Sequence, residues 1–580
     1  MTATSTDTVP TRTPAPSSWD ALTAERVALQ EQGLVPAFMT TAGYAMFTAK
    51  YTHGDQTVRE RYETIAATAG DLADELYPRD DATSWTGHFL EAIWYGWLSP
   101  STPVLANLGT ERGLPVSCEG SYVEDSVWGF YDTLKEAAIL SQNGFGTSAY
   151  LGDVRPRGAR FSDNGQANGV VPVFCNFVEM TNQISQGATR RGSWAGYLPV
   201  DHPDFFELAD LIYREPANKN VGWIFTQAFI DRMLAGDADA LERYQRVLRI
   251  RVVLGKGYIW KVDTVNAAQT ASYRAHGLEN KASNLCSEIT LFSDEEHSYT
   301  CVLSSLNLAT YDAWRDRDTA YVATVFLDAV AEAFLRRARS IRGLERAVRY
   351  TEKARSLGLG VMGYHDHLQQ HRIPFESEEA AVFNRDVFAR IHERADAASR
   401  WMAERAGTPE WCVGRRNSHL MAVAPTMSTA VIVGGTSQGI EPFVANVWNQ
   451  TTSAGEMPRA NPNLVALMEE RGVHDRAHLD DIVDHAGSVA HVDWLDEHEK
   501  AVFRTGYEID QEVLLERAAE RQEHIDQSQS LNLFFEADAT PQQISAVHKK
   551  ALLDPRIKSL YYLRSRAGVQ ASKQRSATSS

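Results

Sequence analysis

One short segment, SNLCSEITL at residues 283–291, places three chemically different side chains at alternate positions. In an extended loop or strand, Asn284, Cys286 and Glu288 would point to one side, because side chains alternate along such a chain. The carboxylate can remove a hydroxyl proton and the amide can orient a second hydroxyl. A buried cysteine with polar neighbours on the surface is nevertheless the more ordinary interpretation of this spacing.

The other four of the five cysteines give weaker signals when each is taken alone. Cys118 lies in PVSCEGSY and Cys301 opens CVLSSLNLA, and the sequence does not show that they meet in space. We interpret Cys175 and Cys412 as packing residues, since isolated cysteines are commonly small buried apolar groups. Five cysteines in 580 residues is an odd and small number. It favours a protein of the reducing cytoplasm over a secreted protein held together by disulfides. No CxxC or His/Cys cluster has zinc-finger spacing, so no metal site is expected.

A second polar segment, APTMST at residues 424–429, offers small hydroxyls directly before a glycine-rich stretch. Thr426, Ser428 and Thr429, together with nearby backbone N–H groups, could bind phosphate. An ordinary capped helix start explains the same residues.

The elements that must position these residues divide the chain into two parts. Residues 18–98 show apolar side chains at three- and four-residue spacing, which predicts a helical N-terminal region. Over residues 99–567, short β-branched runs alternate with helical stretches, which indicates an α/β architecture with parallel strands. The polar ends, residues 1–17 and 568–580, are expected to form a disordered arm and a flexible tail.

Composition limits the classes of function. The chain has 580 residues, 43% hydrophobic, enough for a large core. It contains no run of about 18 apolar residues, so no membrane span is expected. The net charge of −18 argues against non-specific binding of nucleic acid. The N-terminus lacks the apolar core of a secretory signal, which favours a cytoplasmic location.

Seven blocks, in order, resemble the large catalytic subunit of class I ribonucleotide reductases over roughly residues 90–567. They are SPSTPVLANLGT, NLCSEI, CVLSSLNLA, LGLGVMGY, APTMSTAVIVGGTSQGIEPF, IDQSQSLNLF and SLYYLRSR. The resemblance implies a ten-stranded α/β barrel of two parallel five-stranded halves, with a central finger loop that carries the radical cysteine. Periodicity alone supports only the α/β class.

The resemblance also implies catalytic roles. Cys286 resembles the cysteine whose thiyl radical abstracts the 3′-hydrogen of the substrate. Glu288 resembles the base that takes the 3′-hydroxyl proton, and Asn284 resembles the hydrogen-bond partner of the sugar hydroxyls. Cys118 and Cys301 resemble the dithiol that supplies two electrons and becomes a disulfide.

Other positions match binding and radical-transfer residues of the family. Tyr561 and Tyr562 resemble the pair that relays a radical from a small subunit, although one buried and one exposed tyrosine on a strand is a common arrangement. The residues that match substrate-binding positions are Thr102, Ser117, Thr426, Ser428 and Thr429.

The same resemblance predicts partners and ligands. Asp125 and Arg155 match residues that contact a nucleotide effector (dNTP or ATP), and the loop at Tyr213–Val221 matches the one that transmits effector identity. Because the family's effector site lies at a dimer interface, a homodimer is implied. The radical cofactor, a metal or tyrosyl centre, is expected in a partner small (beta) subunit and not in this chain. The expected substrates are ribonucleoside diphosphates, with a thiol reductant.

Three alternatives and two departures remain. A cobalamin-dependent class II reductase would need no relay, which the tyrosine pair argues against. A glycyl-radical reductase would need an RVxGY-like site, and an inactive nucleotide-binding paralogue would not need every catalytic residue. No ATP-cone is recognisable before residue 90, so control by dATP of overall activity is not expected. No cysteine follows Tyr562, so re-reduction is expected to depend on an outside thiol.

Overall fold

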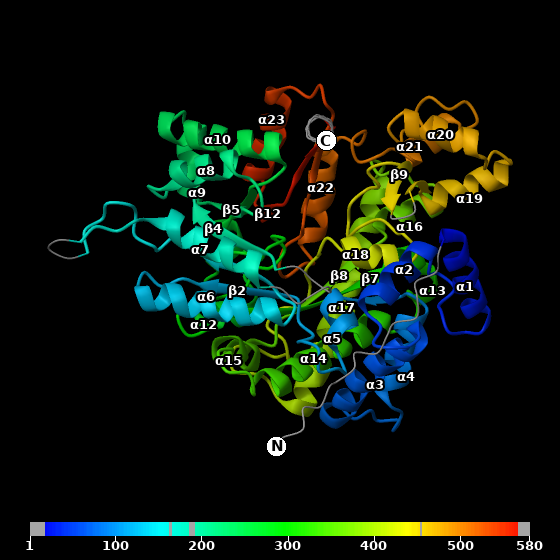
Figure 1. The fold of residues 1–580 in the computed structure, drawn as a ribbon, viewed down its shortest axis with the longest axis horizontal. Coiled ribbons are helices and arrows are strands. Elements are labelled where there is room, and N and C mark those ends of the chain that lie inside the picture. Colours follow the sequence, from blue (N-terminus) through cyan, green and yellow to red (C-terminus); the bar gives the residue numbers. More distant parts are fainter. Residues whose placement is uncertain (1–17, 162–164, 185–191, 453–454, 567–580) are drawn as a thin grey trace, which may run out of the picture.

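The computed structural model describes residues 18–161, 165–184, 192–452 and 455–566. The expected N-terminal arm and C-terminal tail therefore lie outside the described residues. The described chain is a mixed α/β protein in which helices surround a curled central sheet (Figure 1).

The N-terminal region is helical, as predicted. It comprises α1 (Trp19–Glu31), α2 (Thr41–Lys50), α3 (Val58–Leu76) and α4 (Trp85–Trp94). Helix α3 begins with a capping box, in which Thr57 and Glu60 each accept a hydrogen bond from the other's backbone N–H. Its buried face contacts α4 and α14 (Thr319–Ala338), so this region packs on the outside of the sheet.

Five parallel strands form the first half of the sheet. They are β2 (Cys118–Tyr122), β3 (Gly146–Tyr150), β4 (Trp194–Pro199), β5 (Asn220–Phe225) and β6 (Tyr258–Lys261). The connecting helices are α6 (Val127–Gln142), α7 (Val170–Gln183), α8 (Phe205–Arg214), α9 (Gln227–Leu234) and α10 (Ala238–Leu254). These strands are buried almost throughout, as expected for parallel strands covered by helices.

The second half is less regular. Its formal strands are β7 (Tyr299–Asn307) and β8 (Leu357–Met362), which are parallel, with β1 (Leu98–Pro100) antiparallel to β7. Parallel bridges then join Leu359 to Met421 and Val423 to Gln529. The last segment holds β12 (Ser559–Leu560) and β13 (Leu563–Ser565), with β13 parallel to β11 (Leu533–Phe535).

The two halves meet along two antiparallel seams, where β2 pairs with β7 and β6 pairs with β12. Five strands in the first half and five segments in the second (β7, β8, 419–423, 527–531 and 559–565) therefore close a ring. This confirms the predicted barrel of two parallel halves. In the second half, part of the 527–530 segment bonds to the loop at the centre: Ser528 N donates to Glu288 O, and Gln527 Oε1 accepts from Thr290 N.

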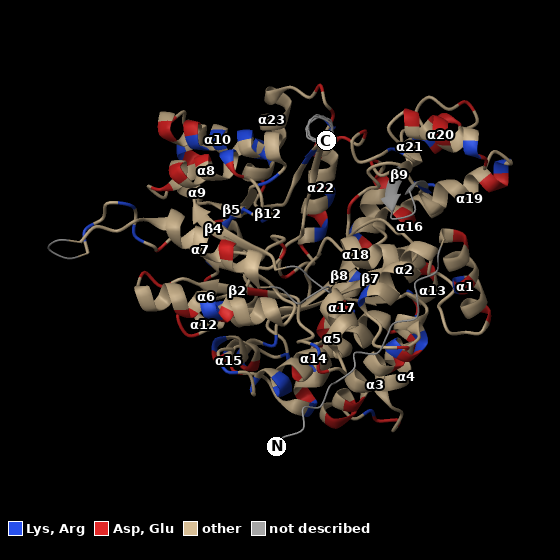
Figure 2. Cartoon of the chain, in the orientation of Figure 1, with Lys and Arg blue, Asp and Glu red and all other residues tan. Residues whose placement is uncertain are grey.

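The remaining elements surround this ring. They are α5 (Thr102–Asn107), α11 (Val262–Ala267), α12 (Ala271–His276), η1 (Leu308–Thr310), α13 (Tyr311–Trp314), α15 (Glu345–Ala354), α16 (Tyr364–Gln370), α17 (Glu378–Ala406), α18 (Met427–Ile432), β9 (Val447–Thr452), β10 (Gly455–Ala460), α19 (Pro462–Arg471), α20 (Arg476–Asp484), α21 (Glu497–Val502), α22 (Gln511–Gln522) and α23 (Pro541–Leu553). Helices α19–α21 project at one corner and have a small hydrophobic core of their own (Figure 1). Charged residues gather on the outer helices, whereas the central strands carry few (Figure 2). Within the described ranges, no helix is long and apolar enough to cross a membrane.

Candidate active site

The segment 283–291 forms the predicted finger loop inside the barrel. Four hydrogen-bond donors of the barrel wall bind successive carbonyl groups of this loop. Tyr197 Oη donates to Asn284 O at 2.7 Å, and Ser530 Oγ donates to Cys286 O at 2.8 Å. Ser559 Oγ donates to Ser287 O and Ser528 N donates to Glu288 O, both also at 2.8 Å. Ser287 takes a left-handed conformation with φ of 63°. Such a conformation is disfavoured for a serine, and it persists because the surrounding contacts fix the loop.

Glu288 is buried beside this turn and accepts a hydrogen bond from Ser530 Oγ at 3.1 Å. Burial raises the pKa of the Glu288 carboxyl to about 7, with hydrogen bonds from its own backbone, Asn284 and Ser530 opposing the rise. A carboxyl group with a pKa near neutrality can both accept and return a proton.

Cys118 and Cys301, whose meeting the sequence does not reveal, are direct partners across the β2–β7 seam. Facing residues on antiparallel strands have Cα atoms about 4.5–5.5 Å apart, within the range of roughly 4.4–6.8 Å that a disulfide spans. Asn284 Nδ2 lies 3.3 Å from Cys118 Sγ, and Gln527 Nε2 lies 3.4 Å from Cys301 Sγ. Burial raises the pKa of the Cys301 thiol, so an amide donor there favours the thiolate that burial disfavours.

Cys118, Cys286 and Glu288 open onto one cavity of about 370 Å³, whereas Asn284 and Cys301 are buried behind its wall and are not among the lining residues. Its lining includes Thr102, Ser117, Cys118, Cys286, Glu288, Thr426, Ser428 and Thr429, all predicted from the sequence, together with Lys50, Ser304 and Ser305. Thr426 adopts a left-handed conformation immediately before α18, and its hydroxyl accepts a hydrogen bond from Gly439 N at 2.8 Å. The backbone N–H groups of the first turn of α18 lack intrahelical partners, so they can serve an anion in the cavity.

Tyr561 and Tyr562 connect Cys286 with the outside of the barrel. Tyr561 Oη lies 3.5 Å from Cys286 Sγ, and the rings of Tyr561 and Tyr562 have centroids 4.0 Å apart. Tyr561 is buried and Tyr562 is partly exposed. Tyr258 on β6 contacts both rings, and its hydroxyl lies 3.5 Å from that of Tyr562.

The residues predicted to bind an effector lie away from this cavity. Asp125 and Arg155 form an ion pair of 2.5 Å next to the start of α6. The same helix exposes Val127, Trp128 and Tyr131, with 73%, 78% and 58% of their surface accessible. The predicted transmitting loop at Tyr213–Val221 covers the end of α8 and the start of β5.

Cys175 and Cys412 do not line the cavity. Cys175 is partly buried on α7. The Cys412 thiol is buried and donates to Ala354 O at 3.3 Å. Burial raises the pKa of the Cys412 thiol to about 12, which keeps it protonated at neutral pH.

Several residues of the site were not predicted from the sequence: Lys50, Tyr258, Gln527 and Ser530. Gln527 and Ser530 stand in IDQSQSLNLF, a block that carries the resemblance, yet nothing in that pattern distinguishes which polar residue faces the cysteines. Tyr258 opens the apolar segment YIWKVDTV, whose pattern predicts a strand and does not distinguish this tyrosine from its neighbours. Lys50 had no signal at all, since it ends a helix of the N-terminal region.

Comparisons with known proteins agree with this geometry. A family model described as "Ribonucleotide reductase, barrel domain" matches residues 116–239, 235–411 and 412–563. A Frog virus 3 (isolate Goorha) protein, provisionally named a ribonucleoside-diphosphate reductase large subunit, is 35% identical over 82% of this chain and 86% of its own. The ribonucleoside-diphosphate reductase large subunit of Invertebrate iridescent virus 3 is 30% identical to this chain, in a match that covers 81% of this chain and 86% of the viral protein. The solved "Actinobacillus ureae class Id ribonucleotide reductase alpha subunit" superimposes with a TM-score of 0.84 at 32% identity, covering 91% of this chain and 97% of that one.

Proposed function

Since the chain belongs to the family of ribonucleotide reductase large subunits, we propose that it reduces ribonucleoside diphosphates to 2′-deoxyribonucleotides by thiyl-radical chemistry. The observation that carries this proposal is the arrangement around Cys286. The Cys286 thiol faces a cavity that Glu288 and Cys118 also line. The hydroxyl of Tyr561, which does not line this cavity, lies 3.5 Å from the Cys286 sulfur.

The reaction would begin with a radical on Cys286. The thiyl takes the 3′-hydrogen of the ribose, while Glu288 takes the proton of the 3′-hydroxyl. The resulting radical expels the 2′-hydroxyl as water, with a proton from the dithiol. The remaining thiol of the Cys118–Cys301 pair then gives a hydrogen atom to C2′, and the disulfide radical anion so formed gives one electron to the 3′-oxo group, which takes back the proton held by Glu288. Cys286 finally returns the hydrogen atom to C3′, and a Cys118–Cys301 disulfide is left. The balance is one ribonucleotide and two thiols giving one deoxyribonucleotide, one water and one disulfide.

Tyr562 and Tyr561 would carry the radical to Cys286. A phenol suits this role because it can lose an electron and a proton together. The steps are short, with 4.0 Å between the ring centroids of Tyr562 and Tyr561 and 3.5 Å from Tyr561 Oη to Cys286 Sγ. A partner small subunit would supply the radical, and no step of the relay inside this chain needs another cofactor. Tyr258 would act as a positioning residue, with its hydroxyl beside that of Tyr562.

The far end of the cavity suits the substrate diphosphate. Thr102, Ser428 and Thr429 offer small hydroxyls, and the first turn of α18 adds backbone donors. Lys50, from the N-terminal helical region, supplies the one cationic side chain among the lining residues, so it would offset phosphate charge.

A homodimer with an effector site is the arrangement that we propose for regulation. The exposed Trp128 and Tyr131 on α6 are apolar surface that a second subunit would cover. The ion pair of Asp125 with Arg155 lies at the start of this helix, where the guanidinium could turn to an effector phosphate. Thiols that must return to the reduced state after each turnover suit the cytoplasm.

The decisive assay is CDP reduction by the purified chain under three conditions: alone, with a candidate small subunit, and with adenosylcobalamin. The tyrosine pair against Cys286 favours dependence on the small subunit. Activity with adenosylcobalamin alone would instead identify a class II enzyme. Absence of dCDP with every small subunit tried, despite tight CDP binding, would favour an inactive paralogue.

A further inference from the structure

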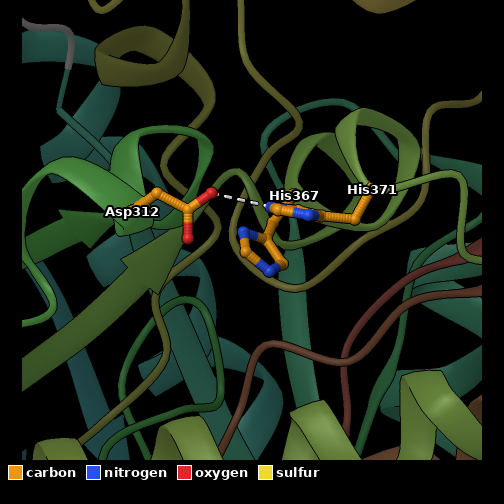
Figure 3. A group of neighbouring side chains, drawn as sticks. All are labelled: Asp312, His367 and His371. Atoms are coloured by element: carbon orange, nitrogen blue, oxygen red, sulfur yellow. Dashed lines mark hydrogen bonds and ion pairs between the residues drawn. The ribbon is translucent and has the colours of Figure 1, made fainter.

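A second cluster of functional groups lies outside the active site, where α13 meets α16. Asp312, His367 and His371 each present one potential ligand atom there, and these atoms all lie within 4.8 Å of one another. His371 Nε2 is 2.8 Å from Asp312 Oδ2. Figure 3 shows the imidazole of His367 directly beside this pair, with one ring nitrogen turned toward Asp312.

The barrel itself brings these residues together. Strands β7 and β8 are parallel neighbours, and each is followed at its carboxyl end by a short helical segment. Asp312 comes from the segment after β7, and both histidines come from the segment after β8. His367 lies in the last turn of α16 and His371, four positions later, is its C-cap residue, so the two side chains lie on the same side of this helix end. The position of α16 is fixed, because Gly363 N and Asp366 Oδ2 both bond the backbone of Ser437.

His367 is an unusual member of such a cluster because its side chain is 5% exposed. Its ring stacks on Phe383 with centroids 4.0 Å apart and planes at 14°. The ring also hydrogen-bonds the backbone carbonyl of Leu308. When one nitrogen of a neutral imidazole donates to a carbonyl, the other keeps a lone pair, and this arrangement is the usual support of a metal-binding histidine.

The donor set selects the kind of ion. Two imidazoles and one carboxylate suit Zn²⁺ and related transition metals, whereas Mg²⁺ and Ca²⁺ prefer oxygen ligands throughout. Zinc-to-ligand distances are about 2.0–2.2 Å, so ligand atoms around one ion stand roughly 3.3 Å apart. A small closure of His367 toward the His371–Asp312 pair would reach that geometry. The side chains of His371 and Asp312 are 42% and 53% exposed, which leaves a coordination position open to water.

We propose that Asp312, His367 and His371 bind one Zn²⁺ or a similar divalent transition-metal ion. The bound ion would link the segment that follows β7 to the segment that follows β8. The site is independent of the proposed reductase reaction, because none of its residues lines the catalytic cavity.

A comparison inside the same chain supports the choice. Asp481, His485 and His491 form the other cluster of this composition among the described residues. The two rings lie close in both clusters, with centroids 3.6 Å apart in this one and 4.3 Å apart at the α13–α16 site, but here all three side chains are exposed. No buried ligand anchors that cluster, so it serves as a matched control.

The test is a titration of the metal-stripped, full-length protein with ZnCl₂ by isothermal calorimetry, in a reductant that does not bind zinc. Wild type and the control His491→Ala are expected to bind one equivalent at the α13–α16 site. His371→Ala and Asp312→Asn are expected to weaken that equivalent by at least about tenfold. Far-UV circular dichroism of each metal-free variant shows that it is folded.

Two further readouts locate the ion. Zn²⁺ should raise the melting temperature of wild type and His491→Ala, and raise it less or not at all in His371→Ala. Co²⁺ should give a spectrum of nitrogen and oxygen ligation. Equal binding by wild type and His371→Ala, loss of binding only in His491→Ala, or a thiolate-to-cobalt band from the active-site cysteines would each overturn the proposal.

Discussion

Replacing Glu288 by glutamine removes an ionisable group from the floor of the cavity while keeping the shape of the side chain. The wild-type carboxyl is buried, and its pKa is raised from 4.5 to about 7. The folded protein therefore holds the proton more tightly than the unfolded chain does. This contribution to stability is fully present below about pH 4.5 and is lost as the pH rises through about 7.

The size of the effect follows from the two pKa values. One pH unit is worth about 1.4 kcal/mol, so the ionised carboxylate costs about 3 kcal/mol once the pH is well above 7. Between about pH 5.5 and about pH 8.5, wild type should lose about 2 kcal/mol of stability from this group. Glutamine does not ionise, so its stability does not change with pH through this group. The unfolding free energy of Glu288→Gln minus that of wild type should therefore increase by about 2 kcal/mol between about pH 5.5 and about pH 8.5.

The assay is urea denaturation of the isolated chain at both pH values, followed by tryptophan fluorescence. Glu279→Gln is the matched control, because Glu279 is an exposed glutamate shortly before the finger loop. In the reductase assay, Glu288→Gln should lose roughly 10²–10⁴-fold in turnover as a missing general base. If the difference in unfolding free energy between wild type and Glu288→Gln does not change with pH, the carboxyl ionises normally and the reasoning fails.

Four further outcomes test the rest of the site. Cys286→Ser should abolish dCDP formation while CDP binding by calorimetry persists, and appreciable product would remove Cys286 from its role. Tyr561→Phe and Tyr562→Phe, which lose only the oxidisable hydroxyl, should each block multiple turnover with the small subunit; near-normal activity of either would take it out of the relay. Lys50→Met should raise the KM for CDP by about tenfold, the loss of one charge-assisted contact, and an unchanged KM would place the diphosphate elsewhere. Cys412→Ser should retain wild-type turnover with dithiothreitol and with thioredoxin, since its thiol is buried against a backbone carbonyl; selective loss with thioredoxin would make it a shuttle.

The parts of the site that could be predicted are those written in short stretches of sequence. Asn284, Cys286 and Glu288 lie within five residues, and the hydroxyls of the 424–429 segment are adjacent. The alternation of strands and helices likewise predicts the α/β class, because the hydrophobic period is a local property. The resemblance then supplied the closed barrel, which periodicity could not.

What could not be predicted depends on pairing across long stretches of chain. Gln527 meets Cys301 across 226 positions, and Asp312 meets His371 across 59. Which polar side chain of a segment faces inward is set by the register of strands that the sequence does not reveal. The partnership of Cys118 with Cys301 was implied by the resemblance, but spacing alone could not show it, since it exists only because β2 and β7 pair antiparallel.

The two antiparallel seams of the barrel carry two different groups of residues that could exchange electrons, a cysteine pair and a tyrosine pair. Cys118 and Cys301, which on the proposed mechanism would give up electrons in pairs, face each other across the β2–β7 seam. Tyr561 and Tyr562, which on the proposed mechanism would pass electrons singly, come directly after β12, the partner of β6 at the other seam. Five strands or segments run from one seam to the other in either direction around the ring, and the finger loop carries Cys286 into the cavity that Cys118 also lines. On the proposed mechanism, the electron pair and the single electron would therefore reach the substrate from opposite seams of the ring.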